Sequence, residues 1–123
     1  MDDEPVVASF CRVVLRGTGI AVDTAMSGLE AIALLKIIRY DLLVADVRMP
    51  LMDGMALYQV LCKEHQYLKQ RTGFISGDML DEATNVFLTQ CGCPFLPKPF
   101  TPVEFIKLID TLISKDCIAL RPY

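Results

Sequence analysis

The apolar positions of this chain fall into two alternating patterns, a helical spacing and short continuous runs. In residues 5–16, Val6, Phe10, Val13 and Val14 stand at offsets of 0, 4, 7 and 8, which predicts one face of a helix. Helical spacing recurs after residue 27, around residues 55–61, over residues 79–90 and after residue 102. Four short runs between these helices, residues 20–24, 42–45, 72–75 and 94–97, are typical of strands. The alternation predicts an α/β fold with a parallel sheet.

Local signals mark where the predicted helices begin and which faces they bury. Ser27 is a predicted N-cap, with Glu30 as its capping-box partner. Pro5 suits the first turn of the first helix, and Thr101 with Pro102 opens the last. We expect the helix over residues 79–90 to use Ala83, Val86, Phe87 and Gln90 as its apolar side, and the last helix to use Phe105, Leu108, Ile109 and Leu112.

Composition narrows the class of protein. A chain of 123 residues is one domain, and 53% hydrophobic residues are enough for a core. The formal net charge of −3 gives no basic footprint for nucleic acid or an anionic membrane surface. No apolar run approaches the ~20 residues of a membrane span, and acidic residues directly after Met1 do not resemble a signal peptide. Five scattered cysteines indicate reduced thiols, so we expect a cytoplasmic location.

Reactive side chains follow three of the predicted strands. Asp46, Ser76 and Lys98 each come at the carboxyl end of an apolar run, where open parallel sheets bind their ligands. Taken singly, each is explained as well by a cap, a turn or a solvated loop. If Asp2 and Asp3 lie beside Asp46, three carboxylates converge and require a cation, for which Mg²⁺ is suited. Together the groups predict phosphoryl transfer, with Asp46 as the nucleophile that forms an aspartyl phosphate.

Four segments resemble the response-regulator receiver domain, the phosphoacceptor module of two-component signalling. They are residues 2–5, 41–54, 74–78 and 95–100, and the intervals between their polar residues are similar to those of the family. The resemblance extends from residue 2 to about 114. The segments 74–78 and 95–100 look most like receivers of hybrid sensor histidine kinases. The resemblance implies a flavodoxin-like (CheY-like) doubly wound parallel sheet of order 2-1-3-4-5.

The resemblance also implies a role for each matched residue. Asp46 is the implied phosphoacceptor, taking its phosphoryl group from a histidine kinase or a phosphotransfer domain. Asp2 and Asp3 are implied Mg²⁺ ligands, together with Asp46 and the backbone carbonyl of Arg48. Ser76 is the implied switch hydroxyl, and Lys98 pairs with phosphate. The implied activity is self-phosphorylation and dephosphorylation only, not that of an enzyme.

Three further positions carry more detailed expectations. The Lys98-Pro99 bond is expected to be cis, as in the family. Phe95 stands at the aromatic switch position, where we expect a ring without a hydroxyl to be buried in both states. Arg48 and Asp78 flank the acceptor and are expected to tune phosphoryl loss. Arg48 could contact the phosphoryl group or form a salt bridge to Asp78, and the sequence leaves both open.

The sequence departs from the family at its beginning, because the first strand is missing. We expect a receiver domain over residues 1–115 and a tail over residues 116–123. The chain could be a fragment, the neighbouring strands could close up, or a foreign strand could fill the place. That strand could come from a homodimer, by strand exchange or edge pairing, or from Asp116–Leu120 of the tail, although a frayed tail is the simpler expectation. We also expect weaker Mg²⁺ binding than in an intact receiver, because Asp2 and Asp3 lie at the terminus.

Other functions remain open at this point. The chain could be a receiver-like module that takes no phosphate and acts through protein contact, which the missing strand favours. An aspartyl phosphatase would need an acid two residues after the nucleophile, and that position holds Arg48. A flavin-binding domain would need a Ser/Thr/Gly-rich phosphate loop after the first strand, and Glu4, Pro5 and Val6 do not form such a loop.

Overall fold

Three parallel strands lie at the centre of the fold. The computed structural model describes residues 4–48, 52–77 and 81–120, with side chains up to residue 114. The described elements, in chain order, are α1 (Pro5–Leu15), α2 (Gly28–Ile37), β1 (Leu43–Asp46), α3 (Gly54–Glu64), the 3₁₀ helix η1 (Gln66–Leu68), β2 (Thr72–Ser76), α4 (Glu82–Cys91), β3 (Phe95–Pro97) and α5 (Pro102–Leu120). The strands lie in the order β1-β2-β3, with Asp46 beside Ile75 and Ser76 beside Pro97.

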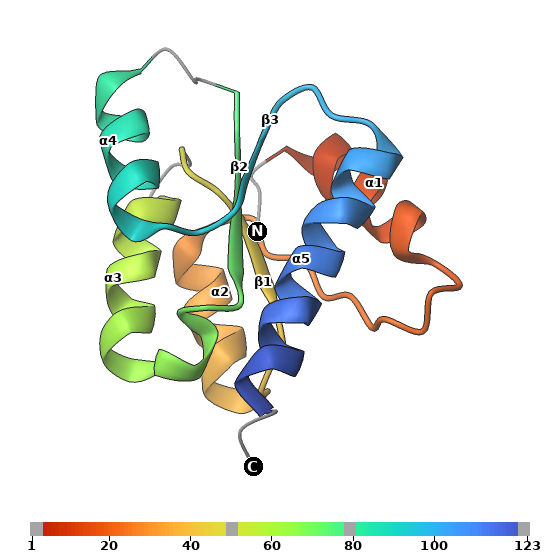
Figure 1. Ribbon diagram of the computed structural model, residues 1–123, viewed down its shortest axis with the longest axis horizontal. Helices are drawn as coiled ribbons and strands as arrows, with labels where there is room; N and C mark the ends of the chain where they lie inside the picture. Colours follow the sequence, from red (N-terminus) through yellow and green to blue (C-terminus); the bar gives the residue numbers. More distant parts are fainter. Residues whose placement is uncertain (1–3, 49–51, 78–80, 121–123) are drawn as a thin grey trace.

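Helices cover both faces of this sheet. In Figure 1, α2, α3 and α4 lie on one side of the strands and α1 and α5 on the other. Two apolar clusters follow this division. One contains Ala45, Leu61, Phe74 and Leu88, and the other contains Leu15, Ile75, Phe105 and Ile109. Because successive strand residues point to opposite faces, Phe74 and Ile75 fall in different clusters. The predicted α/β class with a parallel sheet is confirmed.

Side-chain caps begin four of the described helices, including α5, where the predicted cap Thr101 accepts a hydrogen bond from the amide of Glu104 at 3.2 Å. The Ser27 hydroxyl accepts a hydrogen bond from the amide of Glu30 at 3.2 Å, as predicted for α2. Asp53 accepts from the amide of Ala56 at 3.0 Å at the start of α3, and Asp81 accepts from the amide of Thr84 at 2.9 Å at the start of α4. Each cap satisfies an amide that the first helical turn leaves unpaired.

The buried faces of α1 and α4 differ from the predicted faces. Val6 and Val13 are 79% and 58% exposed, so the predicted face of α1 is wrong at these two positions, whereas the predicted Val14 packs into the core. The α1 residues that pack into the core lie one position further along the chain, at Val7, Cys11, Val14 and Leu15. In α4, Val86 is 47% exposed while Thr84 and Leu88 are buried. Both helices carry apolar residues on adjacent faces, so periodicity did not decide which face meets the sheet. In α5, the four predicted core residues are buried.

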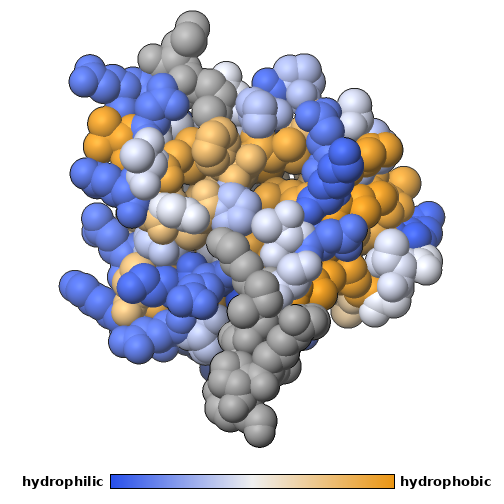
Figure 2. All heavy atoms as spheres, viewed as in Figure 1, coloured by the Kyte–Doolittle hydropathy of each residue, from blue (hydrophilic) through white to orange (hydrophobic). Residues whose placement is uncertain are grey.

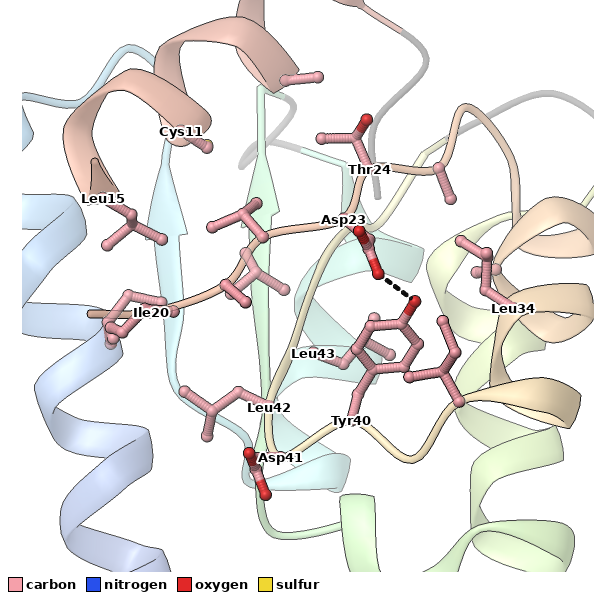
Figure 3. Close-up of a pocket in the computed structure, with 18 of the residues that line it drawn as sticks. Cys11, Leu15, Ile20, Asp23, Thr24, Leu34, Tyr40, Asp41, Leu42 and Leu43 are labelled. Atoms are coloured by element: carbon pink, nitrogen blue, oxygen red, sulfur yellow. Dashed lines mark hydrogen bonds between the residues drawn. The ribbon is translucent and has the colours of Figure 1, made fainter. Parts of the chain in front are cut away.

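The earliest of the four predicted strand-like runs, Ile20–Thr24, is not a strand. It runs as extended chain between α1 and α2, and among the described residues it pairs with no strand of the sheet. A cavity separates it from β1 (Figure 3). An extended segment becomes a strand only when it shares backbone hydrogen bonds with a neighbour, and none of the described strands pairs with this one.

The segment Asp116–Leu120 is helical. It belongs to α5, which continues to Leu120, so the alternative that it fills the place of a strand is wrong. The helix passes through the expected boundary at residue 115. Of the four cysteines whose side chains are described, Cys93 is buried, and Cys11, Cys62 and Cys91 are partly buried.

Some apolar side chains reach the surface. On α4, β3 and α5, Val86 is 47% exposed, Phe95 47% and Val103 61%. Figure 2 shows apolar surface across the middle of one face, with polar groups along its edges. Such surface is available for contact with other molecules.

Candidate functional site

Asp46 lies at the carboxyl end of β1 and is buried. Its side chain is 6% exposed, although a lone carboxylate is costly to bury. Its Oδ1 accepts a hydrogen bond from the backbone amide of Arg48 at 3.0 Å, and its Oδ2 accepts from Nζ of Lys98 at 2.7 Å. A positive charge and an amide therefore compensate the buried carboxylate, and both of its oxygens are held in fixed directions.

Lys98 joins the ends of the three strands. It follows β3, and its backbone amide donates to the carbonyl of Ser76 at 2.8 Å. The Lys98-Pro99 bond is cis, as predicted. The ammonium group of Lys98 also donates to Oε1 of Glu4 at 2.8 Å. The sequence pattern did not assign Glu4 to the site. The Glu4 side chain is 59% exposed, so water screens this pair more than the buried pair with Asp46.

Ser76 is the last residue of β2 and is 1% exposed. Its strand lies between β1 and β3, and the register sets it one residue beyond Ile75, the partner of Asp46. Asp46, Ser76 and Lys98 thus come to the same edge of the sheet. The pattern of strand ends was sufficient to predict this grouping.

Arg48 connects the loop after β1 to α4. Its guanidinium donates to Asp81 and, through Nε at 3.4 Å, to the hydroxyl of Thr84. The Thr84 hydroxyl in turn donates to Asp81 at 2.8 Å. The amide of Thr84 and then Arg48 hold the pKa of Asp81 below its ordinary value. Of the two alternatives for Arg48, the salt bridge to Asp78 falls outside the described residues; the pairing seen is with Asp81.

The expected burial of Phe95 is not observed. The Phe95 side chain is 47% exposed. In the short strand β3 only Leu96 is buried, because the strand lies at the edge of the sheet and alternate residues point outward. The expectation that the ring is buried in both states is therefore wrong for this conformation.

Two of the predicted metal ligands, Asp2 and Asp3, lie outside the described residues. Within the part of the chain that is described, no group of three histidine, cysteine or acidic side chains could hold a metal ion. Of the predicted donors, Asp46 and the backbone of Arg48 are described, and they lie together at the end of β1. Oxygen donors of this kind fit a hard cation such as Mg²⁺.

A comparison with protein families gives one match over most of the chain. The family model for the response regulator receiver domain matches residues 1–110. The curated relatives include the DNA-binding transcriptional regulator NtrC of Klebsiella pneumoniae, 33% identical over 93% of this chain and 24% of that protein. The sensor kinase CckA of Brucella abortus is 31% identical over 94% of this chain and 12% of that protein. The chain thus spans a minor part of the length of these two relatives.

Solved structures with similar folds agree with this match. The signal receiver domain of a signal transduction histidine kinase from Syntrophus aciditrophicus has a TM-score of 0.78 and 31% identity, covering 93% of this chain and 86% of that one. A putative response regulator from Chloroflexus aurantiacus has a TM-score of 0.81 and 28% identity, covering 93% of each chain. In the described residues, no helix is both long and apolar enough to span a membrane.

Proposed function

Because this chain belongs to the response-regulator receiver family, we propose that it accepts a phosphoryl group on the carboxylate of Asp46 and changes conformation in response. The observation that carries the proposal is the buried carboxylate of Asp46, held by Lys98 at 2.7 Å and by the amide of Arg48 at 3.0 Å. A carboxylate fixed at a strand end, next to a movable positive charge, suits transfer of an anionic group.

The donor in this proposal is the phosphohistidine of a histidine kinase or a phosphotransfer domain. An oxygen of Asp46 attacks the phosphorus atom, so an O–P bond forms and the P–N bond of the donor breaks. The electron pair of that bond stays with the imidazole nitrogen. The product is an aspartyl phosphate, and the chain acts on itself rather than turning over a separate substrate.

Lys98, Ser76 and Arg48 supply the surroundings for the transferred group. The ammonium of Lys98 moves from the carboxylate to a phosphoryl oxygen and compensates the added charge of about −1.5 to −2. The hydroxyl of Ser76 donates to another oxygen. Glu4 competes for the same ammonium group at 2.8 Å, so phosphorylation weakens this ion pair. Phe95, beside Leu96 at the sheet edge, is the proposed aromatic switch.

Receiver domains generally bind Mg²⁺ at their acidic site. We propose Asp2, Asp3, Asp46 and the Arg48 carbonyl as the ligands in this chain. These oxygen donors would hold the ion, and a bound Mg²⁺ would supply positive charge to offset that of the carboxylates and the phosphoryl group. Asp46 orients its carboxylate for this through its two hydrogen bonds, one from a backbone amide and one from Lys98.

The wider setting is proposed from the relatives. A receiver within a hybrid histidine kinase is one setting, because CckA of Brucella abortus is a sensor kinase. We place the domain in the cytoplasm and assign it protein partners rather than nucleic acid or membrane. A homodimer formed by strand exchange or edge pairing remains part of this proposal.

The test is the intact mass of the protein after incubation with a small-molecule phosphodonor, with and without Mg²⁺. Asp46→Asn removes the acceptor, and Asp41→Asn is the matched control, because Asp41 is an exposed aspartate that precedes the same strand. We expect one phosphoryl group to be added in a Mg²⁺-dependent way to the natural sequence and to Asp41→Asn, but not to Asp46→Asn.

A second arm supplies a phosphorylated histidine phosphotransfer domain as the donor. Failure with both donors, in protein that keeps its helical circular dichroism spectrum, would refute phosphoryl acceptance. It would favour the module that acts by protein contact alone.

A further inference from the structure

Two of the five cysteines stand one residue apart, at the turn between α4 and β3 (Figure 1). Cys91 ends α4, Gly92 caps the helix in the left-handed region with φ 68° and ψ 11°, and Cys93 follows. These angles are close to the mirror image of helical ones, so the Cα atoms of Cys91 and Cys93 lie about 5.5 Å apart, as residues i and i+2 do in a helix. Disulfides join Cα atoms that are roughly 4.4–6.8 Å apart.

The two sulfur atoms are placed close to one another's backbone. The amide of Cys93 donates a hydrogen bond to Sγ of Cys91 at 3.5 Å. From the other side, Sγ of Cys93 lies 4.0 Å from the carbonyl oxygen of Cys91 and 3.8 Å from that of Lys69. Each sulfur therefore lies against the backbone of the other cysteine, which a disulfide between them requires.

The two thiols differ in how easily a reagent reaches them. Cys93 is 6% exposed and belongs to the apolar cluster that contains Phe74 and Leu88, whereas Cys91 is partly exposed. A Cβ atom at Gly92 would have no neighbour within 4 Å, so the turn between the two cysteines is open. A reagent in solution therefore meets Cys91 before Cys93.

We propose that Cys91 and Cys93 form a reversible disulfide with each other when the protein meets a small-molecule disulfide such as oxidised glutathione. Sγ of Cys91, as the thiolate, attacks one sulfur of the small disulfide, whose S–S bond breaks, and one half leaves and takes up a proton. Sγ of Cys93 then loses its proton and attacks Sγ of Cys91, and the second half leaves as a thiol. The two cysteines are oxidised, and one small disulfide is reduced to two thiols.

The bond closes over the junction between a helix and a strand. The chain after Cys93 is tied to β2, because the carbonyl of Pro94 accepts from the amide of Phe74 at 3.0 Å. A disulfide between residues 91 and 93 therefore fixes the end of α4 relative to the start of the edge strand β3. Because one of its thiols is partly exposed, the bond is of the labile kind that cytoplasmic proteins form transiently.

The test is a mass map of the folded protein after incubation with oxidised glutathione at about pH 8.5, the ordinary pKa of a thiol. The protein is then alkylated in urea and digested with trypsin. Trypsin does not cut before proline, so the fragment 72–107 holds Cys91 and Cys93 and no other cysteine. We expect this fragment to lose the mass of two hydrogen atoms and to remain unalkylated, and to gain two alkyl groups when dithiothreitol is added first.

Two variants separate the roles of the thiols, with circular dichroism as the check on folding. In Cys93→Ala no thiol displaces the second half, so we expect the fragment to keep one glutathione. In Cys91→Ser the remaining thiol is sheltered, so we expect roughly ten times less glutathione than in Cys93→Ala. Cys62→Ser is the matched control, because Cys62 is also partly buried and packs against the same cluster, and it should behave as the natural sequence does.

A peptide tests the contribution of the fold. Gln-Cys-Gly-Cys-Pro has the sequence of residues 90–94 without the surrounding structure. At the same ratio of oxidised to reduced glutathione, we expect the ratio of disulfide to dithiol to be roughly tenfold higher in the folded protein.

Three results would overturn the proposal. The first is a fragment 72–107 of the natural sequence that keeps both thiols, or that carries glutathione without losing two hydrogen atoms. The second is a bond between fragments 72–107 and 49–63, which would make Cys62 the partner. The third is an equal disulfide ratio in the peptide and the protein. None of these measurements uses a phosphodonor or Mg²⁺, so they stand apart from the proposed phosphoryl transfer.

Discussion

Replacing Gly54 with alanine would place a Cβ atom 2.5 Å from the backbone carbonyl oxygen of Asp46 and 3.0 Å from Cα of Val47. Both contacts are with backbone, which has no flexible end to turn away. The start of α3 is also fixed, because the amide of Gly54 donates to the Val47 carbonyl at 3.0 Å and Asp53 caps the helix. The substitution must therefore push α3 away from the end of β1.

The magnitude follows from two opposing terms. Alanine favours a helix over glycine by about 1 kcal/mol, and overpacking against a fixed neighbour costs up to about 3 kcal/mol. The net loss in the free energy of unfolding is about 2 kcal/mol. In a domain of this size that lowers the melting temperature by roughly 5–10 °C.

The assay is thermal unfolding followed by circular dichroism, with Gly77→Ala as the matched control. A Cβ at Gly77 would meet Lys98 Cδ at 3.7 Å, an ordinary contact with a side chain. We expect Gly54→Ala to melt below the natural sequence and to accept phosphate more slowly, because Asp46 is displaced. An unchanged melting temperature for Gly54→Ala, or an equal loss for Gly77→Ala, would refute the steric reasoning.

Three further predictions concern other contacts. Arg48→Met should raise the pKa of Asp81 toward its ordinary value and speed amide exchange at Thr84, both measured by NMR, whereas Arg48→Lys keeps a positive charge. The lowered pKa of Asp81 stabilises the fold at a pH above the ordinary aspartate pKa, and this stabilisation is lost as the pH falls through the lowered pKa. An unchanged Asp81 titration in Arg48→Met would contradict the contact. The hydrogen bond to Asp23 raises the pKa of Tyr40 to about 12. An ultraviolet titration of Tyr40→Phe should therefore lack one tyrosine ionisation step that the natural sequence shows at high pH. The stabilising contribution of this raised pKa is present below pH ~10 and is lost as the pH rises toward 12. Phe74 is 1% exposed and packs against the rings of Tyr58 and Phe87, so Phe74→Ala should lower the free energy of unfolding in urea by about 3–5 kcal/mol. A loss below about 1 kcal/mol would show that neighbouring side chains fill the space instead.

Features that depend on neighbouring residues or on strand ends could be predicted from the amino-acid sequence alone. Ser27 caps α2 because its hydroxyl reaches an amide only three residues away. Asp46 and Lys98 could be grouped from their positions in the chain, since each follows a short apolar run and parallel strands bring their carboxyl ends to one edge. The pairing of Lys98 with Asp46 follows from that shared edge.

Features that depend on contacts between distant elements were settled by packing and could not be predicted in this way. Apolar residues on two adjacent faces of α1 left its buried face open, and packing selected the face with Val7 and Leu15. The contacts of Arg48 with Asp81, and of Lys98 with Glu4, join residues far apart in sequence that leave no local pattern. The segment Ile20–Thr24 has the composition of a strand, but backbone hydrogen bonds need a neighbour, and the cavity beside β1 separates it from the nearest one.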